Sequence, residues 1–350
     1  MEHHLYHQPG NPRNSEGAFV KLAEERILFA YTRYKGESSR DSATADIASV
    51  VSCDGGNSWQ EGGIIVKHTR MNVMSVSLLR LDSGRIALLY LEKSAVDCAG
   101  GNFIDCRPKL IFSDDGAATW SEPVDIAGTP PLYMCVNNDR MVQLSSGRLI
   151  VPGAIHPYCR NGGLSAGYAL FYISDDGGIT WRESEQRCYP PQTMKTGLQE
   201  PGVVELADGR LMAWFRNGDG CQYKAYSSDR GDTWTLPAAA PEFLSPESPL
   251  SMKRHPVTGN LVAVWNDRHP LRSVRYEKQT WGRTPLVLAQ SDDEGKSWKD
   301  HRVLEDDPSR GFGYIAMMFD GAKLFLAYCC GGGSADVHML QDLKIRTVEL

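Results

Sequence analysis

Long hydrophobic runs and an excess of basic residues are both absent from this chain of 350 residues. No stretch of about 18 consecutive apolar residues occurs, which excludes an ordinary membrane-spanning helix. The formal net charge of −6 lacks the basic footprint with which proteins bind nucleic acids. No segment carries a sustained apolar stripe at helical spacing. We therefore expect few helices, no membrane span and no nucleic-acid partner.

Metal-binding and targeting signals are also missing. The nine cysteines lack the paired spacing of a metal site, and their odd number argues against a complete disulfide framework. We therefore predict neither a metal nor a cofactor. The opening segment, MEHHLYHQPGNPRNSEG, has no apolar core of a signal peptide. We expect a cytoplasmic protein, or a secreted or periplasmic one if a signal segment has been removed.

What the sequence does contain is an eight-residue pattern, Ser-x-Asp-x-x-x-Ser/Thr-Trp, in five copies whose starts lie 61, 61, 53 and 64 residues apart. Asp and Gly favour a tight turn, and Trp supplies a large apolar anchor beneath it. We interpret these aspartates as turn residues, because they lack the ligand number of a calcium loop. The copies are SCDGGNSW (52–59), SDDGAATW (113–120), SDDGGITW (174–181), SSDRGDTW (227–234) and SDDEGKSW (291–298).

A second repeat, a turn followed by an apolar strand, alternates with the first. It occurs six times, so the chain contains six repeats of about 50–60 residues. With roughly four strands in each repeat, this number indicates an all-β fold and a six-bladed β-propeller. We expect residues 1–350 to form this single domain, with a terminal segment completing one blade and so removing an open sheet edge. The copies are EERILFAYTR (24–33), SGRIALLYLEK (83–93), SGRLIVPGAIH (146–156), DGRLMAWFRN (208–217), TGNLVAVWND (258–267) and DGAKLFLAYCCG (320–331).

The first repeat, in its form Ser-x-Asp-x-Gly-x-Thr-Trp, resembles the Asp box of sialidases. Over essentially its whole length the chain resembles the sialidase superfamily with BNR/Asp-box repeats. Such boxes also occur in propellers that are not enzymes, so the fold alone does not define a function. The resemblance implies a site at the central mouth of the propeller, built from residues outside the boxes.

Four candidate site residues follow from the resemblance. Glu200 in QEPGVVELADGRL matches the glutamate that polarises the nucleophile, and Arg216 at the end of the next strand matches an arginine that clamps the substrate carboxylate. Arg283 in WGRTPL, just before the fifth box, matches another clamp arginine. Tyr314 in GFGY matches the tyrosine nucleophile.

The loop before the first box is the place where sialidases carry the acid/base aspartate. Its usual distance before the box favours Asp41 over Asp46. Arg33, directly before this loop, matches an arginine at the pocket edge.

The Arg-Ile-Pro motif that supplies the first clamp arginine of sialidases is absent. The corresponding segment is NPRNSEGAF, in which Glu16, rather than Arg13, stands nearest the expected place. Glu16 there would accept hydrogen bonds from sugar hydroxyls, while Arg13 would have to reach the pocket from three residues earlier. In the segment VNNDR, Asn138 and Arg140 are further candidates to line the pocket, with Arg140 as a substitute clamp.

This set of residue types suits the hydrolysis of one kind of glycoside. A sialic acid carries a carboxylate on its anomeric carbon, which repels a carboxylate nucleophile, whereas a neutral tyrosine assisted by a glutamate can attack. An aspartate protonates the leaving oxygen and later activates water. Arginine offers a carboxylate two parallel hydrogen bonds.

Three functions are consistent with the sequence. We expect a sialidase-like retaining exo-glycosidase that removes a terminal sialic acid or related acidic sugar from a glycoconjugate. A hydrolase of a different ulosonic or uronic acid is the first alternative, because the Arg-Ile-Pro motif is missing. A non-catalytic propeller that binds glycans or proteins is the second, although a pure binder has no need of a tyrosine beside a general base.

Overall fold

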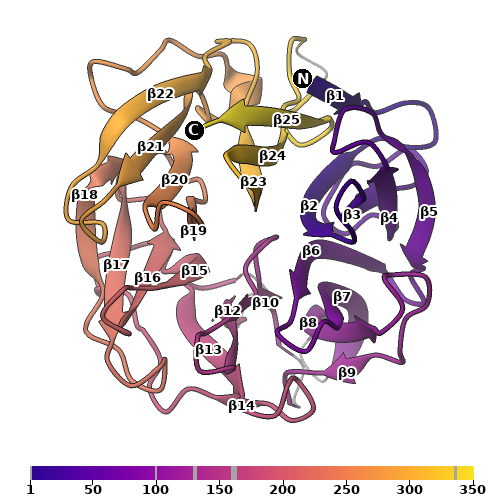
Figure 1. Ribbon diagram of the computed structural model, residues 1–350, viewed down its shortest axis with the longest axis horizontal. Helices are drawn as coiled ribbons and strands as arrows, with labels where there is room; N and C mark the ends of the chain where they lie inside the picture. Colours follow the sequence, from indigo (N-terminus) through magenta and orange to yellow (C-terminus); the bar gives the residue numbers. More distant parts are fainter. Residues whose placement is uncertain (1, 99–100, 129–131, 159–163, 335–336) are drawn as a thin grey trace.

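Six antiparallel sheets stand around a central axis in the computed structural model, which describes residues 2–98, 101–128, 132–158, 164–334 and 337–350 (Figure 1). The predicted six-bladed β-propeller is therefore confirmed. In the described part of the chain the one helical element is the 3-10 turn η1 (Lys278–Thr280). None of the described residues belongs to a helix that is both long and apolar enough to cross a bilayer.

The first three blades follow one another along the chain, and each strand is named here from the axis outwards. Blade 1 contains β2 (Asn14–Lys21), β3 (Ile27–Tyr34), β4 (Ala45–Ser52) and β5 (Gln60–Val66). Blade 2 contains β6 (Asn72–Arg80), β7 (Ile86–Cys98), β8 (Gly101–Ser113) and β9 (Val124–Asp125). Blade 3 contains β10 (Met134–Cys135) and β11 (Val142–Gln143), which both pair with β12 (Leu149–Ile155), then β13 (Tyr168–Ser174) and β14 (Arg182–Glu183).

The last three blades repeat the four-stranded pattern. Blade 4 contains β15 (Gln199–Glu205), β16 (Leu211–Arg216), β17 (Cys221–Ser227) and β18 (Ala238–Leu244). Blade 5 contains β19 (Ser251–Arg254), β20 (Leu261–Asn266), β21 (Leu286–Ser291) and β22 (Lys299–Glu305). Blade 6 contains β23 (Gly313–Asp320), β24 (Lys323–Cys329), β25 (Leu343–Glu349) and β1 (Glu2–Leu5).

The ring is closed by β1, which forms the outer strand of blade 6. It pairs antiparallel with β25, and the register runs from Glu2 opposite Arg346 to Leu5 opposite Leu343. The expectation that a terminal segment completes a blade is thus confirmed. The two ends of the chain lie in one sheet (Figure 1).

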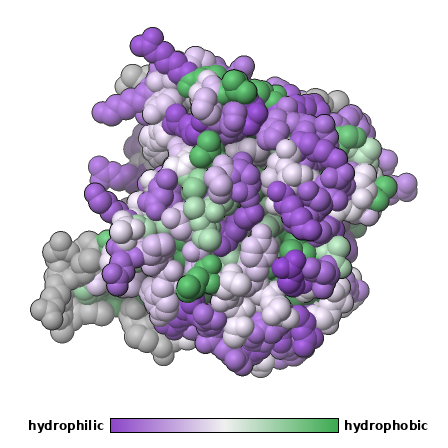
Figure 2. Space-filling view, turned by 90° about the vertical axis from the view of Figure 1, so that its left-hand side faces the viewer, coloured by the Kyte–Doolittle hydropathy of each residue, from purple (hydrophilic) through white to green (hydrophobic). Residues whose placement is uncertain are grey.

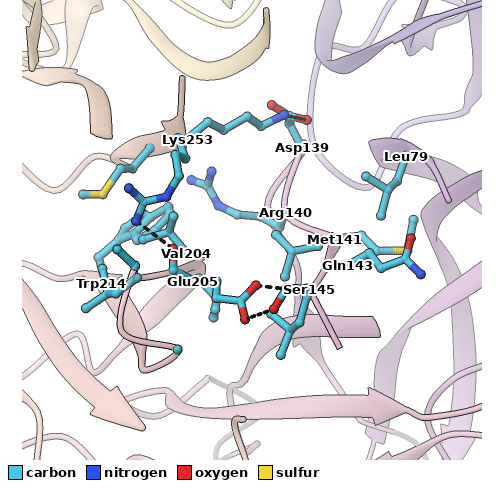
Figure 3. Close-up of a pocket in the computed structure, with 18 residues that line it drawn as sticks. Leu79, Asp139, Arg140, Met141, Gln143, Ser145, Val204, Glu205, Trp214 and Lys253 are labelled. Atoms are coloured by element: carbon cyan, nitrogen blue, oxygen red, sulfur yellow. Dashed lines mark hydrogen bonds and ion pairs between the residues drawn. The ribbon is translucent and has the colours of Figure 1, made fainter. Parts of the chain in front are cut away.

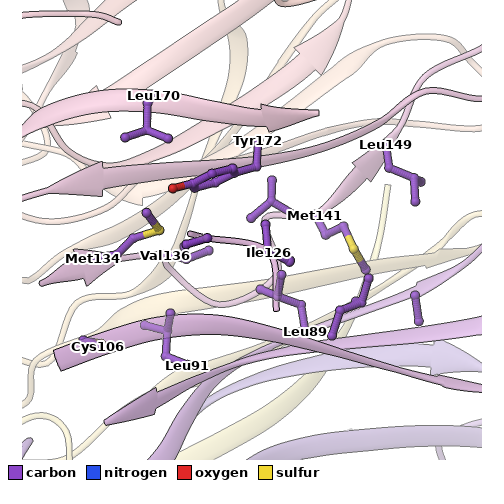
Figure 4. Close-up of a cluster of buried hydrophobic side chains, with 14 of the residues drawn as sticks. Leu89, Leu91, Cys106, Ile126, Met134, Val136, Met141, Leu149, Leu170 and Tyr172 are labelled. Carbon is purple, nitrogen blue, oxygen red and sulfur yellow. The ribbon is translucent and has the colours of Figure 1, made fainter. Parts of the chain in front are cut away.

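The two sequence repeats occupy different parts of each blade. The turn-and-strand repeat forms the second strand, as in β3 and β16, and the box forms the turn between the third and fourth strands. Neighbouring blades pack face to face through apolar side chains, as Leu89 and Leu91 of blade 2 do against Met134 and Tyr172 of blade 3 (Figure 4). The outer wall over β18 and β22 is mostly hydrophilic, with hydrophobic residues in small groups (Figure 2).

The box aspartates are used by the turns themselves. In the third box, Asp176 accepts hydrogen bonds from the Ser174 hydroxyl at 2.8 Å and from the amide and hydroxyl of Thr180 at 2.9 and 2.5 Å. These hydrogen bonds lower the pKa of Asp176 to about 2. Trp181 donates its indole N–H to the Gly178 carbonyl at 3.0 Å and so closes the turn from below. A carboxylate satisfied in this way has no part in a distant site.

Five of the six inner strands share a backbone feature at the end of the channel where they start. A residue other than glycine there has a φ of 43–58°, in the left-handed region: Glu16, Ser75, Asp139, Glu200 and Tyr314. In four of these blades the ladder slips at the same place, as between Gln199 and Gly202 and between Gly313 and Ala316. Such bulges turn a side chain out of the strand's ordinary alternation, and strained backbone of this kind clusters at functional sites.

The inner strand of blade 3 is interrupted between β10 and β11, and residues 136–141 extend across the channel. Asn138 donates to the Gly17 carbonyl of blade 1 at 2.7 Å and to the Tyr314 carbonyl of blade 6 at 3.1 Å. Asp139 accepts from Lys253 of blade 5 at 2.7 Å. This central segment (136–141) therefore links blade 3 to blades 1, 5 and 6.

The third box offers a test of how each box closes on the preceding blade. Gly177 and Gly178 both have positive φ, 74° and 93°, but a Cβ on Gly177 meets nothing, whereas one on Gly178 lies 2.7 Å from the Phe112 ring of blade 2. We expect Gly177→Ala to cost about 1–2 kcal/mol through backbone strain. Gly178→Ala should cost roughly 1–3 kcal/mol more through overpacking. Urea unfolding of both variants measures the difference, and equal losses would show that contact with blade 2 is unimportant.

Candidate active site

A cavity of about 730 Å³ opens at the end of the channel where the inner strands begin. Six of the ten predicted site residues line it: Arg13, Asp41, Glu200, Arg216, Arg283 and Tyr314. They come from blades 1, 4, 5 and 6, so the ring brings together residues far apart in the sequence. The wall is completed by residues that include Tyr133, Cys135, His156, Trp281 and His338.

Tyr314, Glu200 and Arg216 form a connected polar group in this cavity. The Tyr314 hydroxyl donates to Glu200 Oε1 at 3.3 Å, and Arg216 Nη1 donates to Glu200 Oε2 at 2.8 Å. Arg216 Nη1 also lies 3.4 Å from the Tyr314 hydroxyl. The bulges at Glu200 and Tyr314 aim the two side chains at each other across the channel.

The electrostatics of this group suit proton removal from a tyrosine. Burial opposes ionisation of Glu200, but the charge and hydrogen bond of Arg216 outweigh it, so the pKa of Glu200 lies below its ordinary value. Burial and the Glu200 carboxylate raise the pKa of Tyr314. Glu200 is therefore an ionised acceptor beside a protonated phenol. The phenol becomes a nucleophile only when its proton moves to Glu200 as it attacks.

Two arginines hold unused N–H groups beside the tyrosine. Arg283 is 3% exposed and donates from Nη2 to the Glu247 carbonyl at 3.0 Å, but its Nη1 has no partner in the described structure. Nε of Arg216 is likewise unpartnered. The Arg283 guanidinium carbon lies 5.2 Å from the centre of the Tyr314 ring. Buried cations with free donors are suited to an anionic ligand.

Arg13 reaches the cavity, whereas Glu16 does not line it. Arg13 donates from Nη1 to Asp41 Oδ1 at 2.5 Å, from Nη2 to Glu16 Oε2 at 3.1 Å and from Nε to the Ser15 hydroxyl at 3.0 Å. Glu16 is 4% exposed and also accepts from the Ser75 hydroxyl at 3.1 Å. The prediction that Glu16 contacts the sugar is therefore corrected: its carboxylate is used in holding Arg13.

Asp41, and not Asp46, faces the cavity from the loop between β3 and β4. The Asp41 side chain is 60% exposed. Burial of its surroundings opposes ionisation, but the charges of Arg13 and Lys93 outweigh it, and the pKa of Asp41 lies below its ordinary value. Asp46 is fully buried in β4 and is bound at 2.5 Å by both Lys35 and His68. The choice of Asp41 over Asp46 therefore agrees with the geometry.

Besides Glu16, three predicted binding residues lie away from the cavity. Arg33 pairs with Glu61 at 2.8 Å on the outside of blade 1, because the register of β3 turns it from the channel. Asn138 is buried, and its amide nitrogen holds main-chain carbonyls, including that of Tyr314. Arg140 directly follows Asp139, which has a positive φ, and its guanidinium turns to blade 5.

Arg140 belongs to a second cavity, of about 520 Å³, lined by the far ends of the inner strands (Figure 3). Its guanidinium donates to the Leu250 carbonyl at 2.6 Å and the Ser251 hydroxyl at 3.1 Å. With no carboxylate bonded to it, burial lowers the pKa of Arg140 to about 10. Arg140 is thus no substitute clamp in the cavity of Tyr314.

Several cavity residues were not predicted from the sequence. Trp281 is 49% exposed, has a φ of 53°, and stacks on His338 with ring centres 5.7 Å apart. His156 lines the cavity while its ring bonds the Ser165 carbonyl at 3.1 Å. The neighbouring Gly282 is the one sequence signal that could have pointed to Trp281. Across the ranges described, no group of three or more His, Cys, Asp or Glu side chains is arranged to hold a metal ion.

Comparison with known proteins gives matches at the level of family and fold. The family model of the BNR repeat-like domain matches residues 25–326. A sialidase of Paraclostridium sordellii is 26% identical over 343 residues, covering 89% of this chain and 80% of that protein. A protein of unknown function from Dyadobacter fermentans has a similar structure, with a TM-score of 0.76 at 17% identity over 100% of this chain and 98% of that one. The NanB sialidase of Streptococcus pneumoniae gives 0.72 at 16% identity, over 99% and 70%.

The role assigned to Glu16 leads to a stability test with a matched control. Glu16 and Glu61 each pair with an arginine of blade 1, but the Glu16 side chain is 5% exposed and that of Glu61 is 70% exposed. Glu16→Ala leaves Arg13 with one carboxylate in a buried site, and we expect it to cost about 3 kcal/mol. Glu61→Ala should cost less than about 1 kcal/mol. Urea unfolding compares them, and similar small losses would contradict the assignment.

Proposed function

Because the chain belongs to the BNR repeat-like domain family and to the sialidase superfamily, we propose that it is a retaining exo-glycosidase acting on a terminal sialic acid or a related acidic sugar of a glycoconjugate. The observation that carries this proposal is the contact between the Tyr314 hydroxyl and Glu200, 3.3 Å apart and surrounded by arginines. A neutral nucleophile beside a carboxylate base is the arrangement that an anionic anomeric centre requires.

The proposed reaction proceeds in two displacements. Tyr314 attacks the anomeric carbon while Glu200 takes the phenolic proton, and Asp41 donates a proton to the departing glycosidic oxygen. The bond from the anomeric carbon to the leaving group is exchanged for a bond to the Tyr314 oxygen. Asp41, now ionised, removes a proton from water, and the hydroxide replaces Tyr314, which recovers its proton from Glu200. The two inversions together retain the configuration.

The substrate carboxylate is assigned to Arg13, Arg216 and Arg283. Arg216 and Arg283 still have free N–H groups at the cavity. The nitrogens of Arg13 are already shared among Asp41, Glu16 and Ser15, so a ligand carboxylate must share Arg13 with Asp41. This departure from three free arginines supports the second candidate substrate class, a different ulosonic or uronic acid.

Replacement of the nucleophile is the direct test. We expect Tyr314→Phe to lower kcat by at least about 10³-fold, because no other hydroxyl touches Glu200 among the described contacts. Tyr276→Phe, at a tyrosine that is 46% exposed and outside the cavity, is the control. The substrates are aryl glycosides of N-acetylneuraminate, its deaminated analogue, octulosonate and glucuronate. Undiminished turnover by Tyr314→Phe would reject the mechanism, and the preferred glycoside identifies the sugar.

The lowered pKa of Asp41 predicts an acidic pH dependence. A general acid must be protonated, and Asp41 in the free enzyme loses its proton below its ordinary pKa. The value of kcat/KM for sialyllactose should therefore fall about tenfold per pH unit as the pH rises above 5, because Glu200 stays ionised throughout. Asp41→Asn should remove this slope together with most of the activity. A rate that is independent of pH between 5 and 8 would contradict the role of Asp41.

A further inference from the structure

Two buried side chains of blade 2 contact the loop that carries Asp41. We propose that Asn72 and Lys93 position Asp41 for proton transfer, an inference that rests on the proposed function. Neither side chain lines the cavity of Tyr314, so both are positioning residues and not catalytic ones. They are partners in the ladder between β6 and β7, where Asn72 lies directly opposite Lys93.

Asn72 holds the turn on both sides of the acid/base residue. It is fully buried, and its Nδ2 donates to the Asp41 carbonyl at 2.8 Å and to the Ala43 carbonyl at 2.7 Å. The turn itself is closed by the Ala43 amide, which donates to the Arg40 carbonyl at 2.8 Å. One buried amide group of blade 2 therefore fixes the main chain of blade 1 at Asp41.

Lys93 adds a second donor and a charge. Lys93 is 3% exposed, and its ammonium donates to the Asp41 carbonyl at 3.2 Å and lies 5.6 Å from the centre of the Tyr133 ring. It forms no salt bridge with any carboxylate in the described ranges, although a buried ammonium is ordinarily paired. Its field instead acts on the carboxylates of Asp41 and Glu16, where it favours ionisation.

The side chain of Asp41 has little fixed support of its own. Its carboxylate is largely exposed, and Arg13 is its one hydrogen-bond donor among the described residues. The rest of the loop tip is bound through Ser39, whose carbonyl accepts from Arg13 at 3.3 Å and whose hydroxyl lies 3.0 Å from His338 Nε2. When a substrate carboxylate competes for Arg13, the main-chain anchor at Asn72 and Lys93 is what keeps Asp41 beside the glycosidic oxygen.

The test exploits the need of the leaving group for a proton. An aryl leaving group departs with little help from an acid, whereas a sugar alcohol requires protonation. We expect Asn72→Ser to lower kcat/KM for sialyllactose at least about tenfold more than for 4-nitrophenyl N-acetylneuraminide. Lys93→Met should show a smaller selective loss, because removing the ammonium also favours the protonated form of Asp41. Lys109→Met is the control, because Lys109 lies in the same blade and pairs with Asp125, away from the loop. Thermal unfolding verifies that each variant is folded.

Each result decides the inference. Equal losses on the two substrates, or no loss in folded variants, would overturn it. If Lys93→Met does not fold, Asn72→Ser and Lys93→Gln give the same comparison. If the wild-type protein hydrolyses neither substrate, the proposed function fails separately, and a crystal structure of Asn72→Ser then decides: displacement of residues 39–43 supports the anchoring role, and an unchanged turn refutes it.

Discussion

The left-handed backbone at the start of the inner strands is the constraint on which the site depends. A regular inner strand points its side chains alternately at the two neighbouring blades, and none along the axis toward a ligand. In four of the inner strands a bulge changes this at one residue, and so Glu200 and Tyr314 meet although 114 residues separate them. Each such residue costs of order 1–3 kcal/mol, and the apolar cores between the blades provide the stability that tolerates it.

The charged side chains of the site are paired with one another, with one exception. Glu200 is balanced by Arg216, and Glu16 and Asp41 share Arg13, while no carboxylate of the described residues lies within hydrogen-bonding distance of Arg283. The cavity therefore contains a buried cation that can pair with an anion from outside. Arg13 is different, because whatever anion binds it also changes the surroundings of Asp41. In the proposed mechanism, binding of the substrate and the acidity of the proton donor are in this way coupled through one guanidinium.

The sequence was sufficient for the fold and for naming six residues that share one cavity, and the reasons differ from residue to residue. Repeats reveal blades because every blade needs the same turn and the same buried strand. Four positions could be predicted because their segments resemble sialidase segments: Tyr314, Glu200, Arg216 and Arg283. Counting residues along a strand failed for Glu16, because the bulge shifts the alternation by an amount that the sequence does not display.

The predictions that Arg140 and Asn138 line the pocket failed for a related reason. The inner strand breaks between β10 and β11, and residues 136–141 cross the axis there. No local sequence pattern predicts this course of the chain. The contacts of Asn72 and Lys93 with the Asp41 loop join two blades, so only the assembled ring shows them.

The pairing of β1 with β25 has a consequence for the protein while it is being made. Leu5 finds its partner only when Leu343 has left the ribosome, some 340 residues later, a delay of roughly 20 to 70 s at ordinary rates of synthesis. During that time β1 is free and the nascent chain has open strand edges that can join a neighbouring chain. Blades 1 to 5 can form as they emerge, but the ring closes only when β25 is available to pair with β1. Shielding of the strand edges therefore matters for this fold before β1 pairs with β25 and much less afterwards.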